Sequence, residues 1–299
     1  MTSIPTPTRS RSEADRRKAF FYAEADASLY DAAADLNTPM FSLMHETMQY
    51  LVRQHREALN NQGKGNHFVC LDIGSGTGAE SIGILKDFPD SRVVAFDLCE
   101  PMHEIFRTKA KAAIGTEGEK NRCRYLSGDI ASEAGSQTNL LKPIEDWDQR
   151  EGYDLVISAL TLHHLTPTEK KEVFQRIWSV LNPDGLFING DIFTYQSPTM
   201  AHMANDFGLE WIRKQFTTPD PHLKSMLDSL GNRKSAMMES WLEHYMLYNL
   251  PDPIESTDQA GCNLQNMHIG QAEMLVEAGF SEISTPFRFW EVGIVWAKR

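Results

Sequence analysis

Glycines at alternate positions follow a short apolar run that carries a carboxylate. The run at residues 69–73 has strand character and contains Asp72, and Gly74, Gly76 and Gly78 come after it. An alanine-rich helical pattern begins directly afterwards. Glycines allow positive φ angles and let a ligand approach the main chain, and the helix N-terminus offers unpaired N–H groups. The pattern therefore predicts a strand, a tight turn and a helix that together hold a polar ligand.

Two more carboxylates follow predicted strands. Asp97 ends the apolar run at residues 92–96, and Asp129 follows the run at residues 123–126. An acidic residue at the tip of the second strand is placed to accept hydrogen bonds from ribose hydroxyls. We therefore predict an adenosine-containing ligand over the carboxyl ends of parallel strands, and the spacing alone fits NAD, FAD and S-adenosylmethionine.

The sequence of the glycine turn favours one of these ligands, because it resembles a motif of a known family. The run at residues 71–78 resembles the first motif of class I S-adenosylmethionine-dependent methyltransferases, acidic-x-G-x-G-x-G, and residues 154–191 resemble their fourth to sixth motifs. The resemblance covers residues 67–191 and 269–298, and within the family it is to the small-molecule branch. It implies an α/β fold, a Rossmann-like seven-stranded sheet with an antiparallel last strand, and S-adenosylmethionine as cofactor. The chain is also distantly similar to carboxy-S-adenosylmethionine synthases.

The same resemblance implies which residues touch the cofactor. It assigns Asp129 to the adenine amino group and Ile130 to the adenine ring, although an Asp here could instead only cap turn amides. Tyr22 or Tyr30 would touch the methionine end, with packing on the core as the alternative. The predicted cofactor-binding set is Tyr22, Tyr30, Asp72, Gly74, Ser75, Gly76, Gly78, Asp97, Leu98, Met102, Asp129, Ile130, Ser158, Ala159, Leu160 and His163.

Candidates for proton transfer lie after the fourth and fifth predicted strands. Methyl transfer from a sulfonium needs alignment, exclusion of water and often the removal of one proton. His163 and His164 are the first candidates, because imidazole titrates near neutrality; a structural role for both is the alternative. Tyr195 and His244 are further candidates, and the helical stripe that contains His244 could equally be packing. No third ligand stands near the histidine pair, so no metal site is predicted.

The order of the predicted elements divides the chain into four parts. Residues 1–12 read as a disordered tail, and residues 13–62 as an N-terminal helical lid. The S-adenosylmethionine-binding Rossmann-like domain comprises residues 63–191 and 269–299, and residues 192–268 form an inserted helical segment that caps the substrate.

Two segments of that domain are predicted to be peripheral. Residues 115–120 read as a charged loop, and residues 132–151 as a polar surface insertion around a short helix. The chain should close with a helix from residue 269 to 278 and two strands, 281–289 and 291–297.

Composition narrows the classes of partner. The chain has 299 residues and a formal charge of −12, which argues against a generally basic nucleic-acid footprint. Its four cysteines are scattered without metal-binding spacing, which indicates a reducing compartment. We find no apolar run of membrane-helix length and no apolar segment at the N-terminus. We expect a cytoplasmic monomer or homodimer with a small-molecule substrate, no nucleic-acid partner and no membrane.

Four functions fit these observations to different degrees. The first is direct in-line methyl transfer to a small-molecule acceptor. The second uses S-adenosylmethionine itself as substrate, by cyclising the aminobutyl arm with release of methylthioadenosine or by modifying the sulfonium. A non-catalytic cofactor-binding or RNA-associated protein is a third, and an NAD-dependent dehydrogenase is disfavoured by the glycine spacing.

Overall fold

The structure is a computed structural model. It describes residues 34, 36, 38–65, 67–145, 147, 151–193, 195, 197–219, 221–229, 231, 238 and 268–299, and Tyr22, Tyr30 and His244 lie outside them. Its helices are α4 (Phe41–Asn61), α5 (Ala79–Asp87), α6 (Glu100–Arg122), α7 (Gln137–Leu141), α8 (Pro167–Val180), α9 (Pro198–Thr217), α10 (Pro221–Ser229) and α12 (His268–Ala278), with short 3₁₀ turns η1 (Glu133–Gly135), η2 (Lys142–Ile144) and η3 (Leu162–His164). Its strands are β1 (Val69–Ile73), β2 (Arg92–Asp97), β3 (Cys123–Ser127), β4 (Tyr153–Ala159), β5 (Leu181–Ile192), β6 (Glu282–Phe289) and β7 (Val292–Lys298).

The strands form one seven-stranded sheet in the order β3-β2-β1-β4-β5-β7-β6. The first five strands in this order are parallel to one another, whereas β7 is antiparallel to both β5 and β6. The carboxyl ends of β1, β2, β4 and β5 therefore meet at one edge, where open α/β sheets bind ligands. This topology confirms the predicted Rossmann-like fold with an antiparallel last strand.

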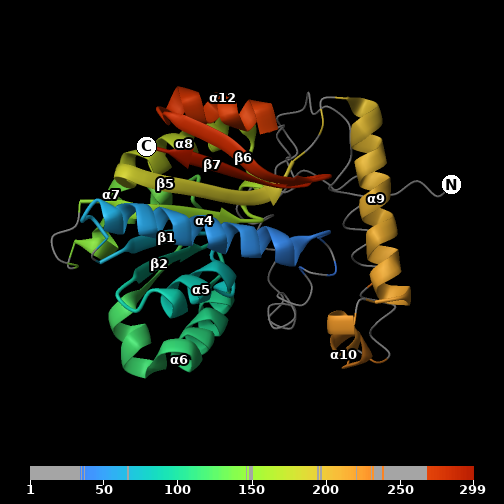
Figure 1. Cartoon of the computed structure of the whole chain (residues 1–299), viewed down its shortest axis with the longest axis horizontal. Coiled ribbons are helices and arrows are strands. Elements are labelled where there is room, and N and C mark those ends of the chain that lie inside the picture. Colours follow the sequence, from blue (N-terminus) through green and yellow to red (C-terminus); the bar gives the residue numbers. More distant parts are fainter. Residues whose placement is uncertain are drawn as a thin grey trace.

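Helices cover both faces of the sheet (Figure 1). One core cluster, which includes Leu71, Phe174 and Phe187, lies under α7, α8 and α12. The other, which includes Cys70, Ile84 and Phe106, lies under α4, α5 and α6. Burial on both faces explains why the central strands read as continuous apolar runs rather than alternating ones.

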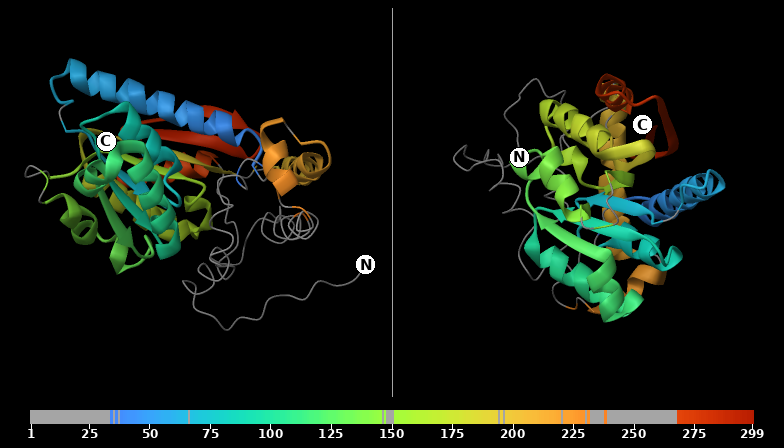
Figure 2. Two further views of the ribbon diagram at one scale, coloured as in Figure 1. Left: turned by 90° about the horizontal axis from the view of Figure 1, so that it is seen from below. Right: turned by 90° about the vertical axis from the view of Figure 1, so that its left-hand side faces the viewer.

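Helix α4 packs lengthwise on the sheet (Figures 1 and 2). Its Met44, Met48 and Val52 are fully buried, at the helical spacing that the sequence shows. The fit against β5 is close, because a Cβ at Gly190 would come within 2.4 Å of the Met48 sulfur. This part of the predicted lid thus belongs to the core of the domain, and a lid over the cofactor stays a prediction for the residues before it.

The segment expected to be a charged loop is helical. Helix α6 runs to Arg122, with a kink at Gly115, whose φ of 79° is outside the helical range. Glycine takes this conformation without the Cβ penalty of other residues, so the chain turns there and then resumes the helix. The prediction of a loop at residues 115–120 was wrong.

The segment expected to lie on the surface contributes to the core. The short helical turns between β3 and β4 are present, but Leu140, Ile144 and Trp147 are buried against the sheet. Guanidinium groups of Arg92 and Arg124 lie over the Trp147 ring, 5.5 and 4.8 Å from its centroid. The buried Trp147 ring therefore packs against arginines of both β2 and β3.

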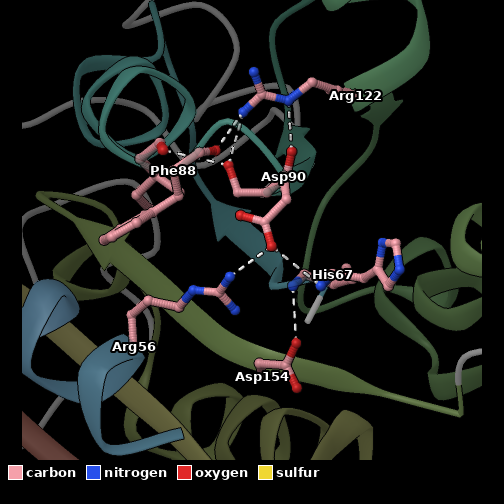
Figure 3. Close-up of polar contacts among 9 residues, drawn as sticks. Arg56, His67, Phe88, Asp90, Arg122 and Asp154 are labelled. Atoms are coloured by element: carbon pink, nitrogen blue, oxygen red, sulfur yellow. Dashed lines mark hydrogen bonds and ion pairs between the residues drawn. The ribbon is translucent and has the colours of Figure 1, made fainter. Parts of the chain in front are cut away.

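A polar network closes the amino-terminal edge of the sheet, away from the glycine turn (Figure 3). Arg56 of α4 is almost buried and donates to Asp90 Oδ2 at 2.5 Å. The same oxygen accepts the His67 main-chain N–H. Asp154 of β4 accepts the Val69 N–H at 2.9 Å, which fixes the start of β1 beside β4.

Helix α9 lies beyond the carboxyl edge of the sheet (Figure 1). Its Phe207 stacks on Trp290, in the turn between β6 and β7, at 5.1 Å between ring centroids.

In the part of the chain that the structure describes, no helix has the length and apolarity needed to cross a membrane.

Candidate functional site

The glycine turn after β1 has the conformation that its sequence predicts. Gly74, Gly76 and Gly78 have φ angles of 68°, 50° and 83°. The main-chain N–H groups of Gly74 and Ser75 both donate to Phe96 O of β2, at 2.7 and 3.1 Å. These bonds hold the turn against the end of β2.

Asp97 is the carboxylate at the tip of β2. Its Oδ2 accepts the Gly76 N–H at 2.7 Å, and its Oδ1 accepts the Cys99 N–H at 2.8 Å. Burial raises the pKa of Asp97, and these main-chain N–H groups and that of Leu98 lower it. Each carboxylate oxygen can accept a further hydrogen bond, so the side chain is fixed in place and still able to bind two hydroxyls.

Two further acidic residues, Asp72 and Glu80, lie under the turn. Asp72 is buried and accepts the Ser81 hydroxyl at 2.5 Å, and Glu80 of α5 lies 2.8 Å from His45 Nδ1 of α4. Burial raises the pKa of Asp72 well above its ordinary value, and the charge of Glu80 raises it further. Asp72 Oδ1 and Ser75 Oγ are buried without a hydrogen-bond partner among the described residues. Both atoms belong to predicted cofactor-binding residues.

The loop after β3 forms another wall. Asp129 is half-buried and lines the cleft, and its Oδ1 accepts the Ala131 N–H at 2.9 Å. Asp129 therefore caps its own turn at the wall of the cleft, and its contact with the adenine amino group stays a prediction. Ile130 lies beside it on the same wall.

The loop after β4 forms a further wall of the cleft. The Thr161 hydroxyl donates to Ala159 O at 2.9 Å and lies against the glycine turn, since a Cβ at Gly74 would come within 2.0 Å of Thr161 Oγ1. Ser158 is fully buried and donates to Ile73 O, which ties β4 to β1. Its role in this structure is to hold two strands together.

The two adjacent histidines have different surroundings. His164 lines the cleft, whereas His163 is buried beneath it with Nδ1 2.5 Å from Asp191 Oδ1. Their ring centroids are 3.9 Å apart. Sequence reasoning named both histidines but not Asp191 as a partner, because the contact depends on how β4 and β5 pair.

These walls line an open cleft, in which the empty space, including the solvent at its mouth, is about 720 Å³. Eight of the predicted cofactor-binding residues line it, namely Gly74, Gly76, Asp97, Leu98, Met102, Asp129, Ile130 and Leu160. The other described members of that set, Asp72, Ser75, Gly78, Ser158, Ala159 and His163, lie outside its lining. Sequence reasoning did not name the lining residues Ile73, Phe96, Gly128, Thr161 and Leu165, of which Phe96 and Ile73 could have been found as the last apolar residues of their strands.

Tyr195 lies apart from this cleft. The Arg288 guanidinium lies over its ring, with the guanidinium carbon 4.9 Å from the ring centroid. This contact is next to the end of β5. Among the described residues, no group of three or more His, Cys, Asp or Glu side chains is placed to hold a metal ion.

Comparison with known proteins agrees with this geometry. Residues 70–185, which run from β1 to the start of β5, match the family model described as methyltransferase domain. This segment, which is less than half of the chain, is therefore a methyltransferase domain. S-adenosylmethionine is the cofactor of this family.

Three similar proteins show how far the similarity extends. Malonyl-[acyl-carrier protein] O-methyltransferase of Nitrosospira multiformis is 29% identical over 200 residues, which cover 64% of this chain and 54% of that protein. Carboxy-S-adenosyl-L-methionine synthase of Nautilia profundicola is 19% identical over 272 residues, 91% of each chain. The structure of magnesium protoporphyrin IX methyltransferase from Synechocystis PCC 6803 superposes with a TM-score of 0.52 at 15% identity, over 96% of this chain and all of that one, and supports the fold.

Proposed function

We propose that this protein binds S-adenosylmethionine in the cleft at the ends of β1, β2 and β4 and transfers its methyl group to a small-molecule acceptor. The observation that carries the proposal is the Asp97 carboxylate, which two main-chain N–H groups hold at the cleft wall. A carboxylate fixed in this way is suited to the two hydroxyls of a ribose. The family membership of residues 70–185 supports the same ligand.

The chemistry that we propose is direct in-line transfer. The sulfonium is already activated, so the protein needs to align the acceptor, exclude water and accept at most one proton. His164 is the candidate proton acceptor because its side chain lines the cleft. His163 would hold the His164 ring in place, since it packs against that ring and is itself fixed by Asp191.

One relative points to the class of acceptor. Malonyl-[acyl-carrier protein] O-methyltransferase, described above, acts on malonyl-[acyl-carrier protein], as its name states. We propose a small-molecule acceptor for this chain as well, a cytoplasmic monomer or homodimer, and no nucleic-acid partner; the formal charge of −12 supports the last point.

A second candidate function follows from one comparison. The similarity to carboxy-S-adenosyl-L-methionine synthase extends over 91% of both chains, which is longer than the match to the malonyl relative. In that case S-adenosylmethionine would be the substrate, through modification of its sulfonium or cyclisation of its aminobutyl arm.

One experiment tests both candidates. The purified protein is incubated with S-adenosylmethionine alone, and the bound and released compounds are identified by mass spectrometry. Unchanged bound cofactor supports the methyltransferase, whereas methylthioadenosine or a modified sulfonium supports the second candidate. The Asp97→Ala variant should lose the bound compound and the Asp87→Ala variant, at an exposed site on α5, should keep it; absence of any bound adenosyl compound in the unmodified protein would contradict both.

A further inference from the structure

Arg288 lies in the same row of the sheet as Asp191, the carboxylate that contacts the buried His163. In the sheet register Asp191 of β5 pairs with Gly293 of β7, and Gly293 also pairs with Arg288 of β6. Residues that pair across a sheet point to the same face, so Asp191 and Arg288 share one. Glycine contributes no side chain between them, and their main chains are two strand spacings apart, roughly 10 Å.

The guanidinium of Arg288 reaches the carboxyl end of β5 (Figure 1 shows β5, β6 and β7 side by side). Its Nη2 donates to Phe193 O at 3.3 Å. The group lies over the rings of Phe193 and Tyr195, at 5.5 and 4.9 Å from their centroids. These two rings and the Phe193 carbonyl hold the guanidinium in place.

One nitrogen of this guanidinium has no acceptor among the described residues. This atom, Nη1 of Arg288, is buried. Burial lowers the pKa of Arg288, while a hydrogen bond with Tyr195 and the charges of Tyr195 and Glu291 raise it. A guanidinium stays charged in a protein, and leaving its buried Nη1 without an acceptor is unfavourable, so a bound anion would supply the missing partner.

The cofactor cleft is too far from Arg288 for the cofactor to be the anion that Arg288 binds. The cleft lies at the ends of β1, β2 and β4, whereas β6 is four strands away from β1, roughly 19 Å. The intervening strand β5 carries Asp191, which holds His163 under the cleft. Arg288 is therefore on the acceptor side of the transfer site.

From this arrangement we infer that Arg288 recognises a carboxylate on the acceptor. The inference rests on the proposed function, because it assumes that the acceptor lies between the cofactor cleft and the β6–β7 turn. A carboxylate has two oxygens in one plane, which match the planar fork of a guanidinium. Arg288 would thus position the acceptor and select acids over neutral molecules, without touching the reacting atoms.

Matched pairs of an acid and its amide test this selection. Binding of acetate and acetamide, 4-hydroxybenzoate and 4-hydroxybenzamide, and octanoate and octanamide is measured by calorimetry, on the full chain with and without S-adenosylhomocysteine. We expect at least one acid to bind about tenfold or more tightly than its amide. Arg288→Gln should abolish that preference, Arg288→Lys should keep part of it, and the control Arg53→Gln, at an exposed arginine of α4, should keep all of it.

Two outcomes would overturn the inference. One is that no acid is preferred over its amide in either state of the protein, and the other is that Arg288→Gln keeps the preference. Thermal unfolding of each variant verifies that it is folded, and Arg288→Lys still tests the fork geometry if the glutamine variant is not. Failure to bind S-adenosylhomocysteine would count against the proposed function alone, because the acid preference is also measured without it.

Discussion

His163 Nδ1 and Asp191 Oδ1 lie 2.5 Å apart, and both side chains are buried. His163 comes from the turn after β4 and Asp191 from the end of β5, so the pair joins two neighbouring strands at the ligand edge of the sheet. The next residue, His164, faces the cleft. Two adjacent histidines are therefore expected to respond differently to the same substitution.

His164→Ala should reduce turnover and leave the fold intact. Loss of a general base costs about a hundredfold in rate, while the affinity for S-adenosylhomocysteine should change little. His163→Ala should instead destabilise the protein by about 3 kcal/mol, because the buried Asp191 loses the shortest of its side-chain contacts. Turnover assays and urea unfolding of both variants separate these effects. A stable His163→Ala protein without activity, beside a fully active His164→Ala protein, would reverse the assignment.

Gly74→Ala should abolish cofactor binding. Gly74 has a φ of 68°, and an added Cβ would stand 2.0 Å from Thr161 Oγ1, so the turn must move away from the β4 loop. Gly63→Ala is the matched control, because Gly63 has a φ of 72° and nothing within 4 Å of an added Cβ. The control should cost only the backbone strain, about 1–2 kcal/mol, and bind S-adenosylmethionine normally in calorimetry. Equal loss of binding in the two variants would show that the close approach to Thr161 is unimportant.

The parts of the site that the sequence predicted are those built from local chemistry. Strand, glycine turn and helix follow one another without interruption, and Asp97 ends its strand, so their places at the ligand edge follow from the rules for parallel sheets. The kink at Gly115 was misread for a local reason too. A glycine among charged residues is typical of a loop, and only the structure shows that the helix resumes after it.

The parts that the sequence did not predict depend on distant pairing. The contact of His163 with Asp191 spans 28 positions, and that of the Thr161 side chain with Gly74 O spans 87. The row that joins Asp191 to Arg288 exists only because β7 is inserted between β5 and β6. No local pattern carries such information, since it is fixed by strand order and register.

Arg56→Ala should destabilise the protein more than Asp90→Asn does (Figure 3). The Arg56 side chain is 8% exposed and lies over the rings of Phe68 and Phe88, whereas that of Asp90 is 45% exposed. Solvent screens the exposed partner, so we expect a loss below about 1 kcal/mol for Asp90→Asn and about 2–3 kcal/mol for Arg56→Ala, which also removes packing. Urea unfolding measures both, and equal losses would mean that the ion pair rather than the packing is what stabilises this edge.

Lys170 should make stability depend on pH in the alkaline range. The side chain is fully buried on α8, and burial lowers the pKa of Lys170 from 10.5 to about 8, against the attraction of Asp191 and Glu169. Between these two values the unfolded chain binds a proton that the folded chain does not bind. The contribution of Lys170 to the free energy of unfolding must therefore rise as pH increases through this window, and fall as pH decreases through the folded pKa.

The Lys170→Met variant isolates this contribution. Urea unfolding is measured for the unmodified protein and the variant at several pH values from about 8 to 10.5. The stability of the unmodified protein relative to Lys170→Met should increase across the range, because groups common to both proteins cancel in the difference. Lys171→Met is the control, since the side chain of Lys171 is 49% exposed and pairs with Glu277 on the surface. A constant difference for Lys170→Met, or the same slope for Lys171→Met, would show that the buried amine does not titrate in this window.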